Sequence, residues 1–457
     1  MPEPVFVRAG ETSVFVRELD RPYPLIVKGE GVWLEDAGGT RYLDAVSGGA
    51  MVTSLGHGPN DAIAAAAEQA REISFIYNQQ FTSPAQEALA EELTARAPAG
   101  FDRVHFVTGG AEANETALRL VRAYHVERGE PERTRIVSPA QAYHGPTMAT
   151  LGLTGRPGLR RPFDGFIAQQ LHIPPSTWRF DPSGEAALDA LDRILEEAGP
   201  RSVAAFFAEP VSAAALPGYS PPDAFWRGLD ERRAEHGFLI CLDEVVTGLG
   251  RTGTWFAAEQ LPIEVDVITT AKGLGAGYAA IGAMLCRDHV YAAFEQGSRA
   301  FEHGHTWDGA PLPCAVGRSV LAQLAERGLV ERVRERGPTL RVELAAALEG
   351  CDMVREVRGR GYLLGVEYVD PRDGRSFLPE ELAVARRIDT AALANGLIVY
   401  STQPTADGYA GDQTLLAPAF VASDEELRTI CERLSETVRS VERWVKERLG
   451  APAAAPA

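Results

Sequence analysis

The chain has 457 residues, of which 45% are hydrophobic, and its formal net charge at pH 7 is −18. This length and apolar content allow a large core and favour more than one domain. The acidic balance argues against nucleic acid or an anionic membrane as the main partner, although it leaves room for a local basic pocket that binds a phosphate.

The N-terminal region contains one clear structural pattern. Residues 31–45 read GVWLEDAGGTRYLDA, which is typical of a β-hairpin with a Gly-Gly turn. The first twenty residues lack a basic stretch followed by an apolar stretch, so they predict no secretory signal. We expect residues 1–59 to join a small domain.

Between residues 60 and 315, short apolar runs alternate with segments of helical periodicity. The apolar runs are Val104–Val107, Ile136–Val137, Val203–Phe207, Phe238–Leu242, Val265–Thr269 and Ile281–Cys286. Helical periodicity is clear at residues 110–129, where Ala117, Leu120, Val121 and Tyr124 share a face, and at residues 185–199. Strands that alternate with helices indicate a large α/β domain with a mainly parallel sheet over residues 60–315.

Glycines and charged residues follow several of these runs. They are Gly109-Gly110 with Ala111, Glu209, Asp243 with Glu244, and Lys272. In an open parallel sheet, ligands gather beyond the carboxyl ends of the strands. A glycine-rich turn that opens a helix leaves backbone N–H groups free for a phosphate. Each feature alone is more often a turn, a helix cap or an ion pair, but together they predict an anion cradle, two acidic positions and a lysine at one edge of the sheet.

Lys272 is the only charged residue in the stretch 267–285, VITTAKGLGAGYAAIGAML. Burying an unpaired ammonium is costly, so a lysine in these surroundings is rarely kept for stability. Desolvation lowers the pKa of such a lysine and favours a nucleophilic amine, whereas snorkelling to the surface is the alternative. The glycines after Lys272 lead into another strand, which argues against a dinucleotide-binding loop.

The pattern changes after Pro313. Long, charged, amphipathic helices are indicated at residues 321–337 and 426–449, with strands at Tyr362–Tyr368 and Leu397–Tyr400 between them. We therefore predict a small α+β domain over residues 316–448 and a disordered tail at residues 449–457. The five cysteines are far apart and form no CxxC pair, which is typical of a reduced, cytoplasmic protein and indicates no metal site.

Specific motifs occur in order along nearly the whole chain, among them FVTGGAEANETALRLVR, AYHG, FFAEPV, DEVVTGLGRTG and HGHTWDG. In these motifs the sequence resembles the class III aminotransferases, which are pyridoxal-5′-phosphate (PLP) enzymes. The resemblance implies the PLP-dependent transferase fold type I. Its large domain has a mainly parallel seven-stranded sheet, and its smaller α+β domain is built from both termini.

The resemblance also implies roles for individual residues. Lys272 is expected to form the internal aldimine with PLP, and Asp243 to pair with the pyridine nitrogen of the cofactor. Val245 is expected to pack against one face of the ring, and Tyr143 to stack on the other. Glu209 is expected to lie close to the cofactor in a supporting role.

The cofactor phosphate is expected to be bound by two chains. Gly110 and Ala111 would offer backbone N–H groups, although relatives often have serine at position 111, so one hydroxyl contact is lost here. Thr306 is expected to reach the phosphate of the neighbouring subunit. The resemblance therefore implies a homodimer with shared active sites, or a dimer of dimers.

The implied activity is a transaminase that moves an amino group from an amine or an ω-amino acid to a 2-oxo acid such as pyruvate. A racemase or aminomutase on the same fold is the alternative, because it uses the same lysine and cofactor. A non-catalytic relative is a third hypothesis, against which the intact Lys272, Asp243 and Tyr143 argue.

Two positions at which the sequence differs from the family predict which substrates the enzyme accepts. Tyr400 stands where many relatives have an arginine that pairs with a substrate carboxylate, and a tyrosine cannot provide bidentate pairing. Gly49 and Ala50 stand where many amine transaminases carry a tryptophan, which indicates a wider pocket. We expect dicarboxylic substrates to be poor and pyruvate with a bulky or uncharged amine to be good, unless another arginine, for instance from the partner chain, binds the carboxylate.

The remaining polar residues of the motifs are interpreted as structural. His57 and His144 are expected to be hydrogen-bonded histidines that shape the backbone, and Arg251 is expected to stabilise the fold. Arg358 and Arg360 are expected to form local ion pairs.

Overall fold

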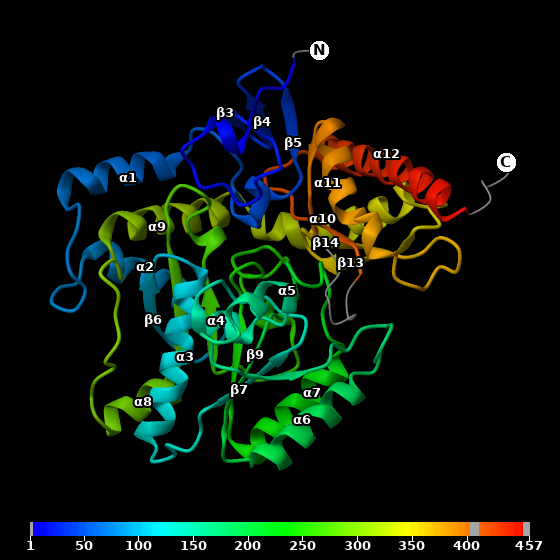
Figure 1. Ribbon diagram of the computed structural model, residues 1–457. Helices are drawn as coiled ribbons and strands as arrows, with labels where there is room; N and C mark the ends of the chain where they lie inside the picture. Colours follow the sequence, from blue (N-terminus) through cyan, green and yellow to red (C-terminus); the bar gives the residue numbers. More distant parts are fainter. Residues whose placement is uncertain (1–2, 403–410, 451–457) are drawn as a thin grey trace.

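The computed structural model describes residues 3–402 and 411–450. Its centre is a seven-stranded sheet (Figure 1). In spatial order, the strands are β6 (Phe101–Val107), β12 (Gly282–Arg287), β11 (Val267–Thr270), β10 (Leu239–Asp243), β9 (Val203–Ala208), β7 (Arg135–Pro139) and β8 (Leu171–Ile173). Only β12 runs antiparallel to its neighbours. The expected mainly parallel sheet is confirmed, and each expected apolar run overlaps one of its strands.

Helices cover this sheet on both faces, with one exception. They are α1 (Asp61–Glu72), α2 (Pro84–Thr94), α3 (Gly110–Glu127), α4 (Met148–Leu153), α5 (Pro157–Arg160), α6 (Glu185–Ala198), α7 (Asp223–His236), α8 (Asp288–Gln296) and α9 (Pro311–Glu326). The exception is α1, which packs on α9. Helix α3 packs its predicted apolar face, including Leu120 and Val121, against buried residues of the sheet such as Phe207 and Val267. None of the helices in the described part of the chain is both long and apolar enough to cross a membrane.

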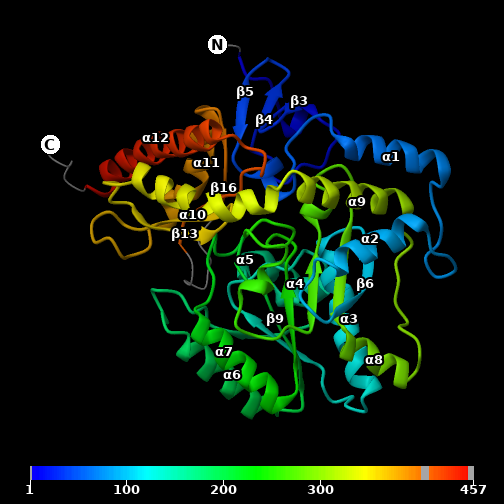
Figure 2. The ribbon, with the colours of Figure 1, turned by 180° about the vertical axis from the view of Figure 1, so that it is seen from behind.

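Two four-stranded sheets form a smaller α+β part beside the large sheet (Figures 1 and 2). The first contains β15 (Leu397–Ile398), β5 (Arg41–Asp44), β4 (Trp33–Asp36) and β3 (Ile26–Glu30); the second contains β13 (Val354–Arg360), β14 (Leu363–Tyr368), β17 (Gln413–Leu416) and β16 (Tyr400–Thr402). Helices α10 (Leu329–Ala347), α11 (Val384–Ala394) and α12 (Asp424–Leu449) pack beside these sheets. The pairing of β15 with β5 joins the two ends of the chain in one sheet, as expected of this fold class.

The predicted hairpin at residues 31–45 is confirmed by the antiparallel pairing of β4 and β5. The domain boundaries at residues 59, 315 and 448 stay predictions. The predicted tail lies outside the described residues from residue 451 onwards.

Two expected elements are divided in the structure. The helical segment 321–337 is split between α9 and α10, because Gly328 adopts a φ of +58° that ends the first helix. The expected strand Leu397–Tyr400 is also split: β15 pairs with β5, whereas β16 pairs with β17. Tyr400 is therefore carried by a different sheet from Leu397.

Arg251 connects the loop after β10 to both small sheets. Its guanidinium donates hydrogen bonds to Ser47 Oγ at 3.1 Å, Pro418 O at 2.6 Å and Tyr362 O at 3.2 Å, and it stacks on the Phe420 ring. Burial lowers the pKa of Arg251 to about 9. These contacts agree with the structural role expected from the sequence.

We expect Arg251→Met to lower the free energy of unfolding by about 2–4 kcal/mol, because three buried oxygen atoms lose a charged donor. Urea denaturation of the purified protein measures this change. The exposed Arg341 provides the control, and Arg341→Met should shift stability by less than about 0.5 kcal/mol. Equal losses in the two variants would contradict a role for Arg251 in joining the sheets.

Candidate active site

A cavity of about 420 Å³ lies beyond the carboxyl ends of β9, β10 and β11. Residues predicted for the site that line it are Ala50, Gly110, Ala111, Tyr143, Glu209, Asp243, Val245, Lys272 and Tyr400. Thr306 is exposed and is not part of this lining. Because the ends of neighbouring parallel strands meet at one edge of the sheet, residues far apart in the sequence converge here.

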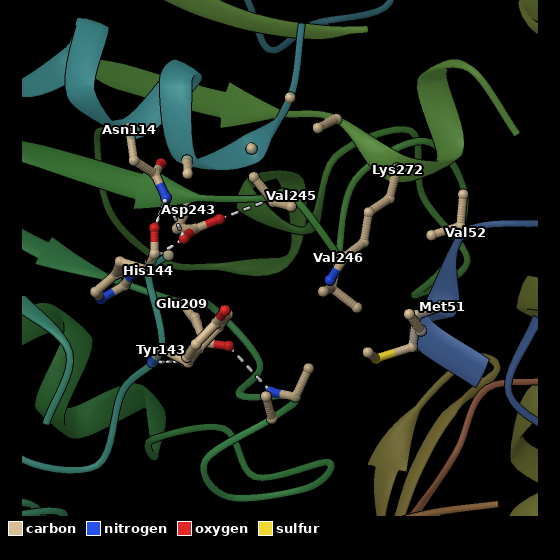
Figure 3. Close-up of a pocket in the computed structure, with 18 of the residues that line it drawn as sticks. Met51, Val52, Asn114, Tyr143, His144, Glu209, Asp243, Val245, Val246 and Lys272 are labelled. Atoms are coloured by element: carbon tan, nitrogen blue, oxygen red, sulfur yellow. Dashed lines mark hydrogen bonds and ion pairs between the residues drawn. The ribbon is translucent and has the colours of Figure 1, made fainter. Parts of the chain in front are cut away.

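Lys272 follows β11 and extends its side chain into the cavity (Figure 3). Its φ of +34° is unusual for a residue with a side chain, and such strained conformations are concentrated at functional sites. Among the described residues, none forms a hydrogen bond or ion pair with Lys272 Nζ. Burial lowers the pKa of Lys272, and the nearby carboxylates of Asp243 and Glu209 partly oppose this effect. The lowered pKa favours the neutral amine that a nucleophile or a base requires.

Asp243 ends β10 and is held by three hydrogen-bond donors. Asn114 Nδ2 donates to Asp243 Oδ2 at 2.8 Å, His144 Nδ1 lies 2.8 Å from the same oxygen, and Val245 N donates to Oδ1 at 3.0 Å. Asn114 in turn accepts a hydrogen bond of 2.6 Å from Thr269 Oγ1. This network fixes the orientation of a carboxylate that is only 5% exposed (Figure 3).

The sequence analysis missed two of these partners. Asn114 was not singled out, although an asparagine on the apolar face of a helix must find hydrogen-bond partners when it is buried. His144 was interpreted as a structural histidine, which was incomplete, because its ring contacts Asp243 directly. His57 does have the expected structural partner, since its Nε2 lies 3.0 Å from Asp44 Oδ2.

Glu209 follows β9 and organises the wall on which Tyr143 lies. Its carboxylate accepts hydrogen bonds from Tyr143 N at 3.2 Å, Ser212 Oγ at 3.2 Å and Ala213 N at 3.1 Å. Burial raises the pKa of Glu209, and it also raises the pKa of the Tyr143 hydroxyl. Glu209 therefore fixes the backbone of Tyr143 and leaves the phenol ring at the cavity (Figure 3).

Glu244 differs from its neighbour Asp243, because it points away from the cavity. Its carboxylate accepts hydrogen bonds from Ala257 N at 2.6 Å, Ala258 N at 2.8 Å and Thr247 Oγ1 at 3.0 Å. Burial raises the pKa of Glu244 to about 7. Only the first carboxylate of the Asp243-Glu244 pair is thus available to a ligand.

Helix α3 begins at the cavity with Gly110, so its first backbone N–H groups lack partners within the helix. A Cβ atom at Gly110 would lie 2.7 Å from Val245 Cγ1, so only glycine allows this close approach. The free N–H groups and the helix dipole make the position suited to an anion.

The opposite wall comes from the smaller part of the fold. Ala50, Met51 and Val52 line the cavity from the segment after β5, and Tyr400 lines it from β16. Met51, with a φ of +62°, and Val52 were not predicted from the sequence (Figure 3). Their position depends on how the small sheets pack, and no local pattern signals it.

The family model for aminotransferase class-III matches residues 15–438. The chain therefore belongs to the class III aminotransferases, and it is an enzyme of the transferase type. The resemblance inferred from the motifs is confirmed.

Curated relatives agree with this assignment. The chain is 34% identical over 436 residues to the uncharacterized aminotransferase YodT of Bacillus subtilis (strain 168), covering 94% of this chain and 98% of the relative. It is 30% identical over 439 residues to the chloroplastic gamma aminobutyrate transaminase 3 of Solanum lycopersicum, covering 93% and 82%, respectively.

Solved structures extend the similarity to the fold. A thermostable (S)-enantioselective omega-transaminase from Thermomicrobium roseum is similar with a TM-score of 0.83 and 33% identity, covering 92% of each chain. The omega transaminase from Pseudomonas jessenii, in complex with PMP, is similar with a TM-score of 0.86 and 28% identity, covering 94% of this chain and 95% of the other.

The Asn114 network gives a prediction about stability. We expect Asn114→Leu to lower the free energy of unfolding by about 2–4 kcal/mol, because buried groups on Thr269, Asp243 and His144 each lose a partner. Thr269→Val removes one hydroxyl from the same network and should cost about 1 kcal/mol. Chemical denaturation of both variants measures the difference, and equal losses would show that Asn114 is not its centre.

Proposed function

We propose that this enzyme is a PLP-dependent transaminase that transfers an amino group from an amine or an ω-amino acid to a 2-oxo acid, with pyruvate as the acceptor. The observation that carries the proposal is the unpaired amine of Lys272 in the same buried cavity as the fixed carboxylate of Asp243. Membership of the class III aminotransferases supports the same conclusion.

The groups at the cavity fit the chemistry of PLP. The free N–H groups of Gly110 and Ala111 at the start of α3 suit its phosphate, and the Asp243 carboxylate suits its ring nitrogen. Lys272 Nζ is the group that would bind its aldehyde covalently. Val245 and Tyr143 would cover the two faces of its ring, with Glu209 supporting Tyr143.

PLP, when bound, supplies an electron sink for the bond that breaks at the amine-bearing carbon. Lys272 Nζ takes a proton from that carbon as a general base and later gives a proton back as an acid. Burial lowers the pKa of Lys272, which favours the neutral amine that this transfer requires. Asp243 would hold a proton at the ring nitrogen of PLP, while Asn114 and His144 keep the Asp243 carboxylate oriented.

We further propose that the enzyme is a homodimer or a dimer of dimers. Thr306 would donate a hydrogen bond to the phosphate bound by the neighbouring subunit. Its exposure supports this role, as does that of Trp307, which is 56% exposed. The five cysteines are all free thiols and all buried, which supports a location in the reducing cytoplasm.

We expect Lys272→Ala to fold and to lose turnover by several orders of magnitude, because the covalent anchor and the base are both removed. Alanine formed from pyruvate and an amine donor measures turnover. Borohydride should attach the cofactor to the peptide that contains Lys272 in the unaltered enzyme, and mass spectrometry detects this product.

The exposed Lys28 provides the control, and Lys28→Ala should retain activity. Near-normal alanine formation by Lys272→Ala would overturn the proposal. If the unaltered enzyme racemised or isomerised an amino acid and formed no alanine from pyruvate, the racemase or aminomutase hypothesis would replace it.

The residues of the cavity wall also support a prediction about which substrates the enzyme prefers. None of the described residues that line the cavity is arginine, and Tyr400 stands at the position expected for one. A tyrosine hydroxyl cannot replace the two parallel hydrogen bonds of a guanidinium. The small side chain of Ala50 leaves room for a bulky amine.

We expect pyruvate to exceed 2-oxoglutarate as an acceptor by at least about tenfold in kcat/KM, since the second carboxylate lacks a charged partner. Tyr400→Phe should change the preference among amines more than the KM for pyruvate, and Ala50→Trp should exclude bulky amines selectively. A panel of donors and acceptors under steady-state conditions tests this expectation. Glutamate reacting as well as the best amine would show that the interpretation of Tyr400 is wrong.

A further inference from the structure

The segment Ser47–Met51, which we call the wall turn, follows β5 and supplies part of the cavity wall. Ala50 and Met51 line the cavity, and the Met51 side chain points toward it (Figure 3). The backbone here is strained, because Ser47 has a φ of +50° and Met51 a φ of +62° although both carry side chains. Such conformations persist only where surrounding contacts hold them, so the wall turn requires anchors.

One anchor is the buried carboxylate of Asp44 at the end of β5. Its Oδ1 accepts a hydrogen bond from Val46 N at 3.0 Å, and its Oδ2 accepts one from Gly48 N. His57 Nε2 lies 3.0 Å from the same Oδ2. Asp44 therefore holds the backbone on both sides of Ser47 and fixes the direction in which the wall turn leaves the strand.

Ser47 provides a second anchor, which the wall turn shares with the rest of the fold. Its Oγ donates a hydrogen bond to Ala417 O at 2.6 Å and accepts one from Arg251 Nη2 at 3.1 Å. These bonds join the turn to distant segments. The bonds of Asp44 stay within residues 44–57, so a change at Asp44 acts directly on the wall turn.

We propose that Asp44 is a positioning residue that holds the wall turn in place, so that a bulky apolar group on the amine donor packs against Ala50 and Met51. This assignment rests on the proposed transaminase function. Asp44 is not among the described residues that line the cavity, so it acts on the donor only through the wall turn. A small amine has too little apolar surface to use this wall, and the effect of Asp44 should therefore depend on the donor.

Asp36 offers a matched control, because it makes the same kind of bonds at another turn. It ends the neighbouring strand β4, is also buried, and accepts hydrogen bonds of 2.9 Å from Gly38 N and Thr40 N, two and four residues further on. Asp44 bonds to its turn at the same two spacings. None of residues 36–42 is part of the described cavity lining, so Asp36→Asn imposes a similar structural loss away from the wall.

The test compares 1-phenylethylamine and propan-2-amine as donors, with pyruvate as the common acceptor. In Asp44→Asn, an amide NH2 replaces one acceptor oxygen, so a hydrogen bond to the wall turn is lost and the strained backbone relaxes. We expect kcat/KM for 1-phenylethylamine to fall by about 5–20-fold, mainly through a higher KM, because the bulky group loses an ordered wall. For propan-2-amine it should stay within about twofold.

Asp36→Asn should leave the ratio of the two donors unchanged within about twofold. A purely structural role of Asp44 would lower the activity with both donors alike. Equal effects of Asp44→Asn on the two donors, or no effect on 1-phenylethylamine, would overturn the assignment.

A double-mutant cycle tests whether Asp44 acts through the wall turn. Met51→Ala removes one side chain on which the bulky group packs, so Asp44→Asn should change the donor ratio less in that background than in the unaltered enzyme. An effect of the same size in both backgrounds would contradict the proposal.

A binding measurement separates this inference from the proposed activity. Acetophenone carries the bulky group without the amine, and calorimetry should show weaker binding to the Asp44→Asn holoenzyme than to the unaltered or Asp36→Asn holoenzyme. If no donor yields alanine, the transaminase proposal fails, and the acetophenone affinities still decide whether Asp44 positions the wall. Equal affinities in all three proteins, including no measurable binding to any of them, would exclude that role.

Discussion

The site depends on keeping the amine of Lys272 and the carboxylate of Asp243 in one buried cavity without an ion pair between them. The carboxylate is satisfied instead by Asn114, His144 and the Val245 amide, so the lysine has no partner among the described residues. Burial lowers the pKa of Lys272 and so favours the neutral form of its amine. The hydrogen-bond network around Asp243 offsets the free-energy cost of burying its carboxylate.

The rest of the fold serves to close this cavity. The parallel strands deliver the chemical groups to one edge of the large sheet, but the opposite wall comes from the small sheets, through Met51 and Tyr400. Arg251 holds those sheets against the loop after β10 with three hydrogen bonds. The side chains of Lys272 and Asp243 and the opposite wall with Met51 and Tyr400 thus come from different layers of the molecule.

Neighbouring residues of similar chemistry have different roles because of their orientation. Asp243 faces the cavity, whereas Glu244 is used by the backbone amides of Ala257 and Ala258. In the same way, Arg160 Nη1 is bonded to His172 Nε2, whereas Arg156 Nη1 donates to the backbone oxygen of Ala214. The residue types at these positions do not distinguish the two roles, and only the direction of each side chain does.

The sequence by itself determined the mainly parallel sheet and the edge at which Lys272, Asp243 and Gly110 gather. Strand periodicity is local, and parallel strands that share a sheet bring their carboxyl ends together, so these positions follow from the order of the elements. Tertiary structure alone decided that Asn114 and His144 hold Asp243, and that the strand expected at Leu397–Tyr400 divides between two sheets. These features arise from contacts between segments far apart in the chain, and the packing that creates such contacts leaves no local pattern in the sequence.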